Sequence, residues 1–209
     1  KGADVSVIGQ TLSFTQAGAG WESIRGNMSK SSGQWYWEMT PTSGGSVHTM
    51  LGVGNSSASI STYPGNNANS YGYESANAMY YNSAVVYNAS TYTLNDVIGF
   101  ALDASSGKTQ VYKNGALQYI FTQALTGPYL PMPSIYGNTG TVTANFGQLP
   151  LKYTPPNGTF LNPKDAASGV TFSNNNMTVG AASAAYLSTR SNTSKSSGKW
   201  YFEVTLTTN

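Results

Sequence analysis

The chain has 209 residues, of which only 9% are charged, and ten Lys and Arg against eight Asp and Glu give a net charge of +2. Ordinary domains carry about 25% charged residues, and the basic residues here are scattered, which argues against nucleic-acid binding. The absence of cysteine excludes disulfides, thiolate chemistry and Cys-ligated metals. No apolar run is long enough to cross a membrane, so membrane insertion is not expected.

Strand signals recur along the chain, and no helical period is present. In chain order they cover residues 34–40, 49–54, 96–103, 108–113, 116–121, 129–136 and 141–146. In the first segment Trp35, Trp37 and Met39 alternate with polar residues, so both tryptophans are expected to fill the core. The nearly continuous apolar run at 96–103 predicts a central strand, and Asn114-Gly115 predicts a type I′ hairpin. Many short antiparallel strands without helices predict an all-β fold, a two-sheet antiparallel β-sandwich.

The chain nearly repeats itself at a spacing of 165 residues. Residues 23–40 read SIRGNMSKSSGQWYWEMT and residues 188–205 read STRSNTSKSSGKWYFEVT, with 12 of 18 positions identical. We therefore expect a tandem array, in which residues 1–153 form a complete sandwich. Residues 154–168, rich in Pro, Gly and Asn, form a linker, and residues 169–209 hold the first strands of a second, truncated repeat.

Six motifs in order resemble those of the SPRY domain. They are GQWYWEM at 33–39, LGVG at 51–54, SYGY at 70–73, LNDVIGFALD at 94–103, VYKNG at 111–115 and VTANFG at 142–147. The resemblance implies a bent, concanavalin-like sandwich of two antiparallel sheets. It is closest to tandem SPRY repeats of phage and bacterial structural proteins, in which similar NPxD and YTPPxG segments flank the domain. Asn95 replaces the usual glycine of the DV[IV]G turn, but Asn tolerates the left-handed conformation, so the turn is expected to form.

Catalytic and metal-binding chemistry is not expected. His48 is the only histidine, and its local sequence SGGSVHTM supplies neither a nucleophile nor a carboxylate, so an ordinary surface histidine is the expectation. Glycoside hydrolysis needs two carboxylates across one cleft, and no two carboxylates lie at strand spacing, although pairing across strands stays open. Calcium is not indicated, because the clustered Asn66, Asn67 and Asn69 have no carboxylate before Glu74. No cofactor is expected.

The strongest functional signal is a concentration of tyrosines among Asn, Ser and Gly between residues 60 and 93. This mixture is typical of paratopes and also suits stacking on sugar rings. Tyr71 and Tyr73 lie in the SYGY block and are expected to be structural. The candidate ligand-binding residues are Tyr63, Asn66, Asn67, Tyr80, Tyr81, Asn82 and Tyr87.

The sequence therefore predicts a non-catalytic binding or adhesion module of a phage virion protein: a tail fibre, an adhesin or a capsid decoration protein. The expected ligand is a host-surface glycan or protein, and the other partners are virion proteins or neighbouring repeats. The expected location is the virion surface, with a bacterial cell surface as the alternative. The competing hypotheses are a structural spacer without a specific ligand and, less favoured, a concanavalin-like carbohydrate hydrolase.

Overall fold

The computed structural model describes residues 1–15, 19–27, 29–44, 48–123, 125–137, 139–153, 161–173, 178–181, 186–191, 194, 196, 204 and 206. The chain divides into two compact units, Lys1–Gly158 and Thr159–Asn209. None of the described residues is helical.

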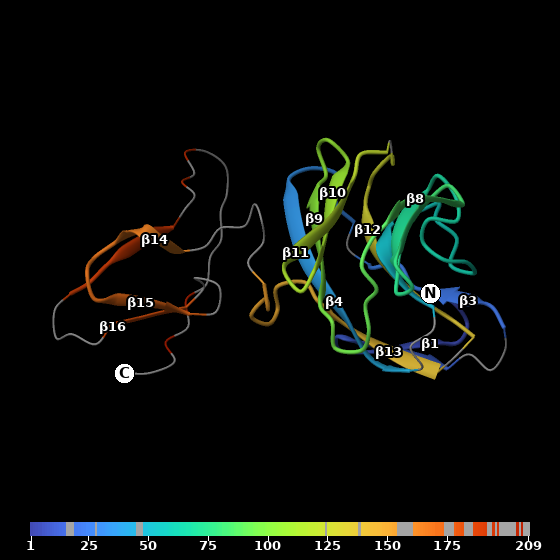
Figure 1. The fold of residues 1–209 in the computed structure, drawn as a ribbon, viewed down its shortest axis with the longest axis horizontal. Coiled ribbons are helices and arrows are strands. Elements are labelled where there is room, and N and C mark those ends of the chain that lie inside the picture. The colour runs from blue at the N-terminus through green and yellow to red at the C-terminus, as the bar shows by residue number, and fades with distance from the viewer. Residues whose placement is uncertain are drawn as a thin grey trace. The chain divides into compact units, whose positions relative to one another are not determined.

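The first unit is a sandwich of two antiparallel sheets, which Figure 1 shows as two layers, with β9, β10 and β11 in one and β8 and β12 in the other. The seven-stranded sheet has the spatial order β1 (Val5–Ile8), β2 (Thr11–Thr15), β13 (Thr139–Asn145), β4 (Gln34–Gly44), β9 (Ile98–Asp103), β10 (Lys108–Lys113) and β11 (Ala116–Phe121). The six-stranded sheet has the order β3 (Trp21–Ser23), β12 (Leu130–Tyr136), β5 (Thr49–Gly54), β6 (Ser70–Glu74), β7 (Ala78–Tyr81) and β8 (Ala84–Asn88). The predicted all-β sandwich is confirmed.

Large apolar and aromatic side chains fill the space between the two sheets. Tyr71 of β6 stacks on Phe121 of β11 with 4.4 Å between ring centroids, and its hydroxyl lies 2.5 Å from the Thr109 hydroxyl of β10. This buried polar contact joins the two sheets, and burial raises the pKa of Tyr71. Tyr73 is also fully buried. The prediction that Tyr71 and Tyr73 are structural is therefore confirmed.

Local sequence signals located several strands correctly. β5, β10 and β11 have the predicted bounds, and Asn114 and Gly115 both have positive φ in the hairpin between β10 and β11. Asn95 has a φ of 68°, so the left-handed turn forms without glycine. The strand β9 is buried along almost its whole length between β4 and β10, as expected of a central strand.

One core prediction was wrong. Trp37 is 4% exposed and stacks on Phe100, whereas Trp35 is 40% exposed. Trp35 lies at the beginning of β4, where its indole Nε1 donates a hydrogen bond to the Ser32 carbonyl at 2.7 Å. This bond holds the ring over the preceding turn, so the alternation of the strand does not place it in the core.

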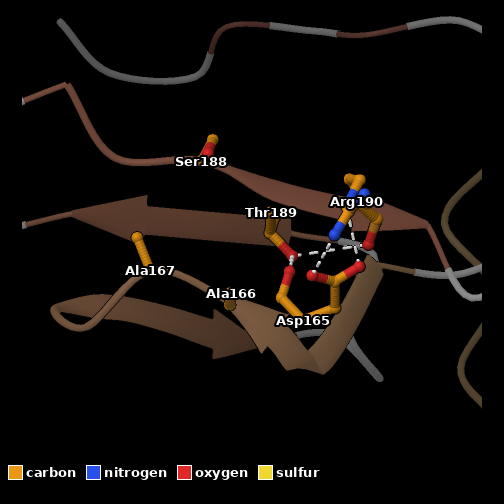
Figure 2. A pocket seen from close by; sticks show the side chains of 6 residues that line it. All are labelled: Asp165, Ala166, Ala167, Ser188, Thr189 and Arg190. Carbon is orange, nitrogen blue, oxygen red and sulfur yellow. Dashed lines mark hydrogen bonds and ion pairs between the residues drawn. The ribbon is translucent and has the colours of Figure 1, made fainter.

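The second unit contains two described pairs of strands: β14 (Leu161–Ala166) with β17 (Thr189–Ser191), and β15 (Val170–Ser173) with β16 (Thr178–Ala181). Arg190 of β17 binds the carboxylate of Asp165 in β14 through two contacts of 2.8 Å. Figure 2 shows the guanidinium facing Asp165 in a surface pocket. Because Arg190 already engages both carboxylate oxygens, this pocket offers no uncompensated acidic group to a ligand.

Candidate aromatic binding surface

A covering loop, residues 55–69, lies on the outer face of the six-stranded sheet. At one edge, Ser23 of β3 donates its backbone N–H to the Ile60 carbonyl at 2.9 Å and its hydroxyl to the Thr62 carbonyl at 2.5 Å. At the other edge, the Ser83 N–H donates to the Gly65 carbonyl at 2.8 Å. These bonds fix the covering loop across the width of the sheet.

Glycine makes this close approach possible. A Cβ on Gly72 of β6 would lie 2.4 Å from the Pro64 carbonyl oxygen, and one on Gly52 of β5 would lie 2.8 Å from the Pro64 Cβ. Both distances are too short for real contacts, so larger residues would push the covering loop away from the sheet. The glycines of the LGVG and SYGY motifs therefore determine where Tyr63 can lie.

Beside the covering loop, five aromatic side chains form a continuous cluster, in which Trp21 has a central place. The Trp21 ring centroid lies 5.2 Å from that of Tyr63, 5.3 Å from Tyr136 and 6.3 Å from His48. Tyr63 in turn contacts Tyr80 at 5.6 Å. With the carboxylate described next, we call this group the ring cluster; its members are Trp21, His48, Tyr63, Glu74, Tyr80 and Tyr136.

Glu74 closes the ring cluster. Its Oε1 lies 3.1 Å from Nδ1 of His48, and the same carboxylate accepts a hydrogen bond from the Tyr80 hydroxyl. Burial, the negative charge of Glu74 and this hydrogen bond raise the pKa of Tyr80, so its hydroxyl stays protonated and acts as a donor. The His48 side chain is 42% exposed and Glu74 13%. The result is a half-exposed aromatic surface with one hydrogen-bonded carboxylate.

This arrangement corrects the expectation for His48. The local sequence offered no carboxylate, but β6 brings Glu74 to it from 26 residues away. Among the described residues, however, no hydroxyl binds the second ring nitrogen, and His48 and Glu74 without a nucleophile do not make a triad. No group of three or more His, Cys, Asp or Glu residues in the described chain could hold a metal ion.

The structure separates the predicted site residues into two groups. Tyr63 and Tyr80 belong to the ring cluster. Tyr81 follows Tyr80 directly in β7, so it points to the opposite face of the sheet, where it packs against the core. Tyr87 of β8 stacks on Tyr119 of β11 with ring centroids 5.0 Å apart, where the edge strands of the two sheets meet. The four tyrosines therefore do not form one surface.

The predicted asparagines build turns. The Asn67 side chain accepts the Asn69 N–H at 2.9 Å, and the Asn66 carbonyl accepts the Ser83 hydroxyl. Asn82 has a φ of 51° in the turn between β7 and β8. Asparagine suits both tasks, because it tolerates positive φ and its amide mimics a backbone group.

Sequence reasoning missed four members of the ring cluster: Trp21, His48, Glu74 and Tyr136. Trp21 and Tyr136 are cross-strand partners in β3 and β12, which are far apart in the sequence. The three-residue strand β3 is too short to give a clear alternating pattern. Local sequence held no signal for this contact, which depends on sheet topology.

The model of the SPRY domain family matches residues 34–149, more than half of the chain. The chain belongs to the SPRY family. SPRY domains are typically protein–protein binding modules. The matched range includes most of the ring cluster but not Trp21, which precedes it.

Solved structures agree on the fold. The SPRY domain of human HERC1 is similar with a TM-score of 0.62 and 17% identity, covering 71% of this chain and 96% of that one. A human SPRY domain is similar with a TM-score of 0.60 and 16% identity, covering 71% and 99%. No curated protein matches the chain in sequence. No helix in the described part of the chain is long and apolar enough to cross a membrane.

Proposed function

We propose that the first unit is a non-catalytic adhesion module of a phage virion protein, and that the ring cluster contacts a host-surface glycan or protein. The observation that carries this proposal is the closed set of contacts among five rings and Glu74 on a face outside the core. Half-exposed Trp and Tyr rings provide contact area at little cost in conformational entropy. Glu74 and the Tyr80 hydroxyl supply fixed hydrogen-bonding groups beside them.

An array of such modules would strengthen a weak site through effective concentration. The two units share local structure in the 165-residue register. The Gly2 N–H donates to the Ser23 carbonyl at 2.8 Å, and the equivalent Ala167 N–H donates to the Ser188 carbonyl at 2.9 Å. The strands β1 and β15 also begin at equivalent residues, Val5 and Val170. These equivalences support residues 169–209 as the start of a second repeat.

The low charge and the absence of cysteine support placing this array on a virion, as a tail fibre, an adhesin or a capsid decoration protein. A bacterial cell surface is the alternative location. Virion proteins or neighbouring repeats would be its other partners. On a spacer without a ligand, the ring cluster would only hold the covering loop in place.

The test compares Tyr63→Ala with the wild-type chain in binding to host cells. Tyr63 lies on the covering loop and is only half-buried, so the variant should keep the melting temperature within about 3 °C, because a loss of about 1 kcal/mol shifts a domain of this size by 2–4 °C. Binding should fall at least tenfold. Tyr87→Ala, at the sheet edges, is the matched control and should bind normally. A folded Tyr63→Ala variant that binds as well as wild type would favour the spacer hypothesis.

A further inference from the structure

The two copies of the 18-residue repeat differ in an unusual way. All three buried apolar residues of residues 23–40 are replaced in the second copy; they are Ile24, Trp37 and Met39. Their counterparts are Thr189, Phe202 and Val204. The positions that are buried in the first copy therefore hold different residues in the second.

The exposed turn before β4, in contrast, is almost identical in the two copies. Residues 29–35 read SKSSGQW in the first copy and SKSSGKW in the second, so six of seven are identical. Recent duplication does not explain this identity, because the exposed residues Ser6, Val7 and Ile8 of β1 are all replaced in the second copy. The retention is densest in this turn, which we call the Lys–Trp turn: six of its seven positions are identical, against six of the other eleven positions of the repeat.

Part of the retention has a structural reason. Gly33 has a φ of 82°, which favours glycine. The Trp35 indole binds the Ser32 carbonyl, and Lys30 Nζ lies 3.4 Å from the Trp35 ring centroid. An exposed cation–π contact contributes only about 0.5–1 kcal/mol. Stability alone is a weak reason to keep a 40% exposed tryptophan where buried residues have changed.

Among the described residues, no carboxylate neutralises the Lys30 ammonium, whose contact is with the Trp35 ring. Asp103 lies opposite Gln34 in β9, but its carboxylate is engaged by the Ser105 N–H at 3.0 Å and the Ser106 hydroxyl at 2.7 Å. These hydrogen bonds and the nearby Lys108 lower the pKa of Asp103, which stays ionised within its own turn.

We propose that Lys30, Trp35 and the hydroxyls of Ser31 and Ser32 form a second binding site, for an acidic polysaccharide. The exposed part of the indole that Lys30 does not cover provides an apolar surface for the C–H face of a sugar ring. The serine hydroxyls, both exposed, donate to and accept from sugar hydroxyls. The ammonium of Lys30 attracts the acid group. A polysaccharide repeats its own recognition unit, which suits a site that recurs with the same residues in the chain.

This site is distinct from the ring cluster. Lys30 pairs through its backbone with Tyr129, directly before β12, whereas Tyr136 of the ring cluster ends that strand. Seven residues at about 3.3 Å each separate the two regions by roughly 20 Å. Variants of one site should therefore leave the other intact.

The test measures binding of the 209-residue chain to alginate, polygalacturonate and hyaluronate by biolayer interferometry, with neutral dextran and poly-glutamate as controls. At least one acidic polysaccharide should bind, and dextran and poly-glutamate should bind at least tenfold more weakly. Lys30→Met, which keeps the aliphatic stem, and Trp35→Ala should each lower binding at least tenfold. Tyr87→Ala, which alters the stack on Tyr119 outside both sites, should not change it.

Three results would overturn the proposal: no binding to any of the acidic polysaccharides, equal binding to poly-glutamate, or unchanged binding by folded Lys30→Met. Equal binding to poly-glutamate would mean that only charge is recognised, as by an acidic protein segment. If Trp35→Ala fails to fold, the binding of Lys30→Met still decides between the outcomes. The Tyr63→Ala experiment on host cells tests the ring cluster separately, so the proposal for either site can be refuted while the other stands.

Discussion

The two sheets of the first unit each hold a segment of irregular backbone on their outer face, but they hold it by different means. On the seven-stranded sheet, the buried carboxylate of Glu38 accepts the backbone N–H groups of Lys152 and Tyr153, each at 2.8 Å. On the six-stranded sheet, neutral groups of Ser23 and Ser83 fix the covering loop, and Gly52 and Gly72 leave space for it. On the seven-stranded sheet, one charged side chain therefore holds the segment. On the six-stranded sheet, several neutral contacts share this task, and aromatic rings stay half-exposed beside the covering loop.

The largest expected effect is from Glu38→Ala. The substitution leaves two backbone N–H groups without their charged acceptor, and hydrogen bonds to charged groups contribute about 1.5–3 kcal/mol. We expect the free energy of unfolding to fall by about 3 kcal/mol, measured by urea denaturation. Glu38→Gln keeps the shape and one acceptor oxygen, so its loss should be smaller.

Limited proteolysis gives an independent measurement of the same contact. Because Glu38 binds the N–H of Lys152, trypsin should cut after Lys152 faster in Glu38→Ala than in wild type under native conditions. Equal cleavage rates would mean that Glu38 does not hold this segment. The residue recurs as Glu203 in the second copy.

On the other sheet, Gly72→Ala should destabilise the unit by about 2 kcal/mol, since overpacking typically costs 1–3 kcal/mol. The added Cβ would meet the Pro64 carbonyl at 2.4 Å and displace the covering loop with Tyr63. Host-cell binding should therefore fall with stability. Gly26→Ala is the matched control, because its Cβ would lie 3.1 Å from the Pro131 side chain rather than from backbone. If Gly72→Ala bound host cells as well as wild type, the ligand would not depend on the position of the covering loop.

Short-range sequence patterns predicted the sandwich and several of its strands. The Asn114-Gly115 turn and the TMLGVG run are local signals, and β5, β10 and β11 follow them closely. Trp35 does not follow the alternation of buried and exposed residues, because its hydrogen bond to the Ser32 carbonyl directs the ring toward the preceding turn. Sequence periodicity holds no signal for such a bond.

The candidate site was less predictable, because the ring cluster joins β3, β12, β6 and β7 with the segment before β5 and the covering loop. Only Tyr63 and Tyr80 were expected there. The sequence did hold a signal that separates Tyr80 from Tyr81, since neighbours in a strand face opposite ways. The Asn82-Ser83 turn beside them made the segment resemble a loop.

The smallest expected effect is from Tyr87→Ala at the meeting edges of the two sheets. Tyr87 is 47% exposed, and its main contact is the stack on Tyr119, whose ring also contacts Phe121 at 4.9 Å. An aromatic pair contributes about 0.5–1.5 kcal/mol beyond its buried area, so we expect a loss of about 1 kcal/mol by urea denaturation. Tyr87→Phe keeps the ring and should lose almost nothing. Ligand binding should stay at the wild-type level in both variants, because the Tyr87 ring stacks on Tyr119, which lies outside the ring cluster. If Tyr87→Ala instead bound as weakly as Tyr63→Ala while remaining folded, the ligand would have to reach the edge strands, and the binding surface would not be confined to the outer face of the six-stranded sheet.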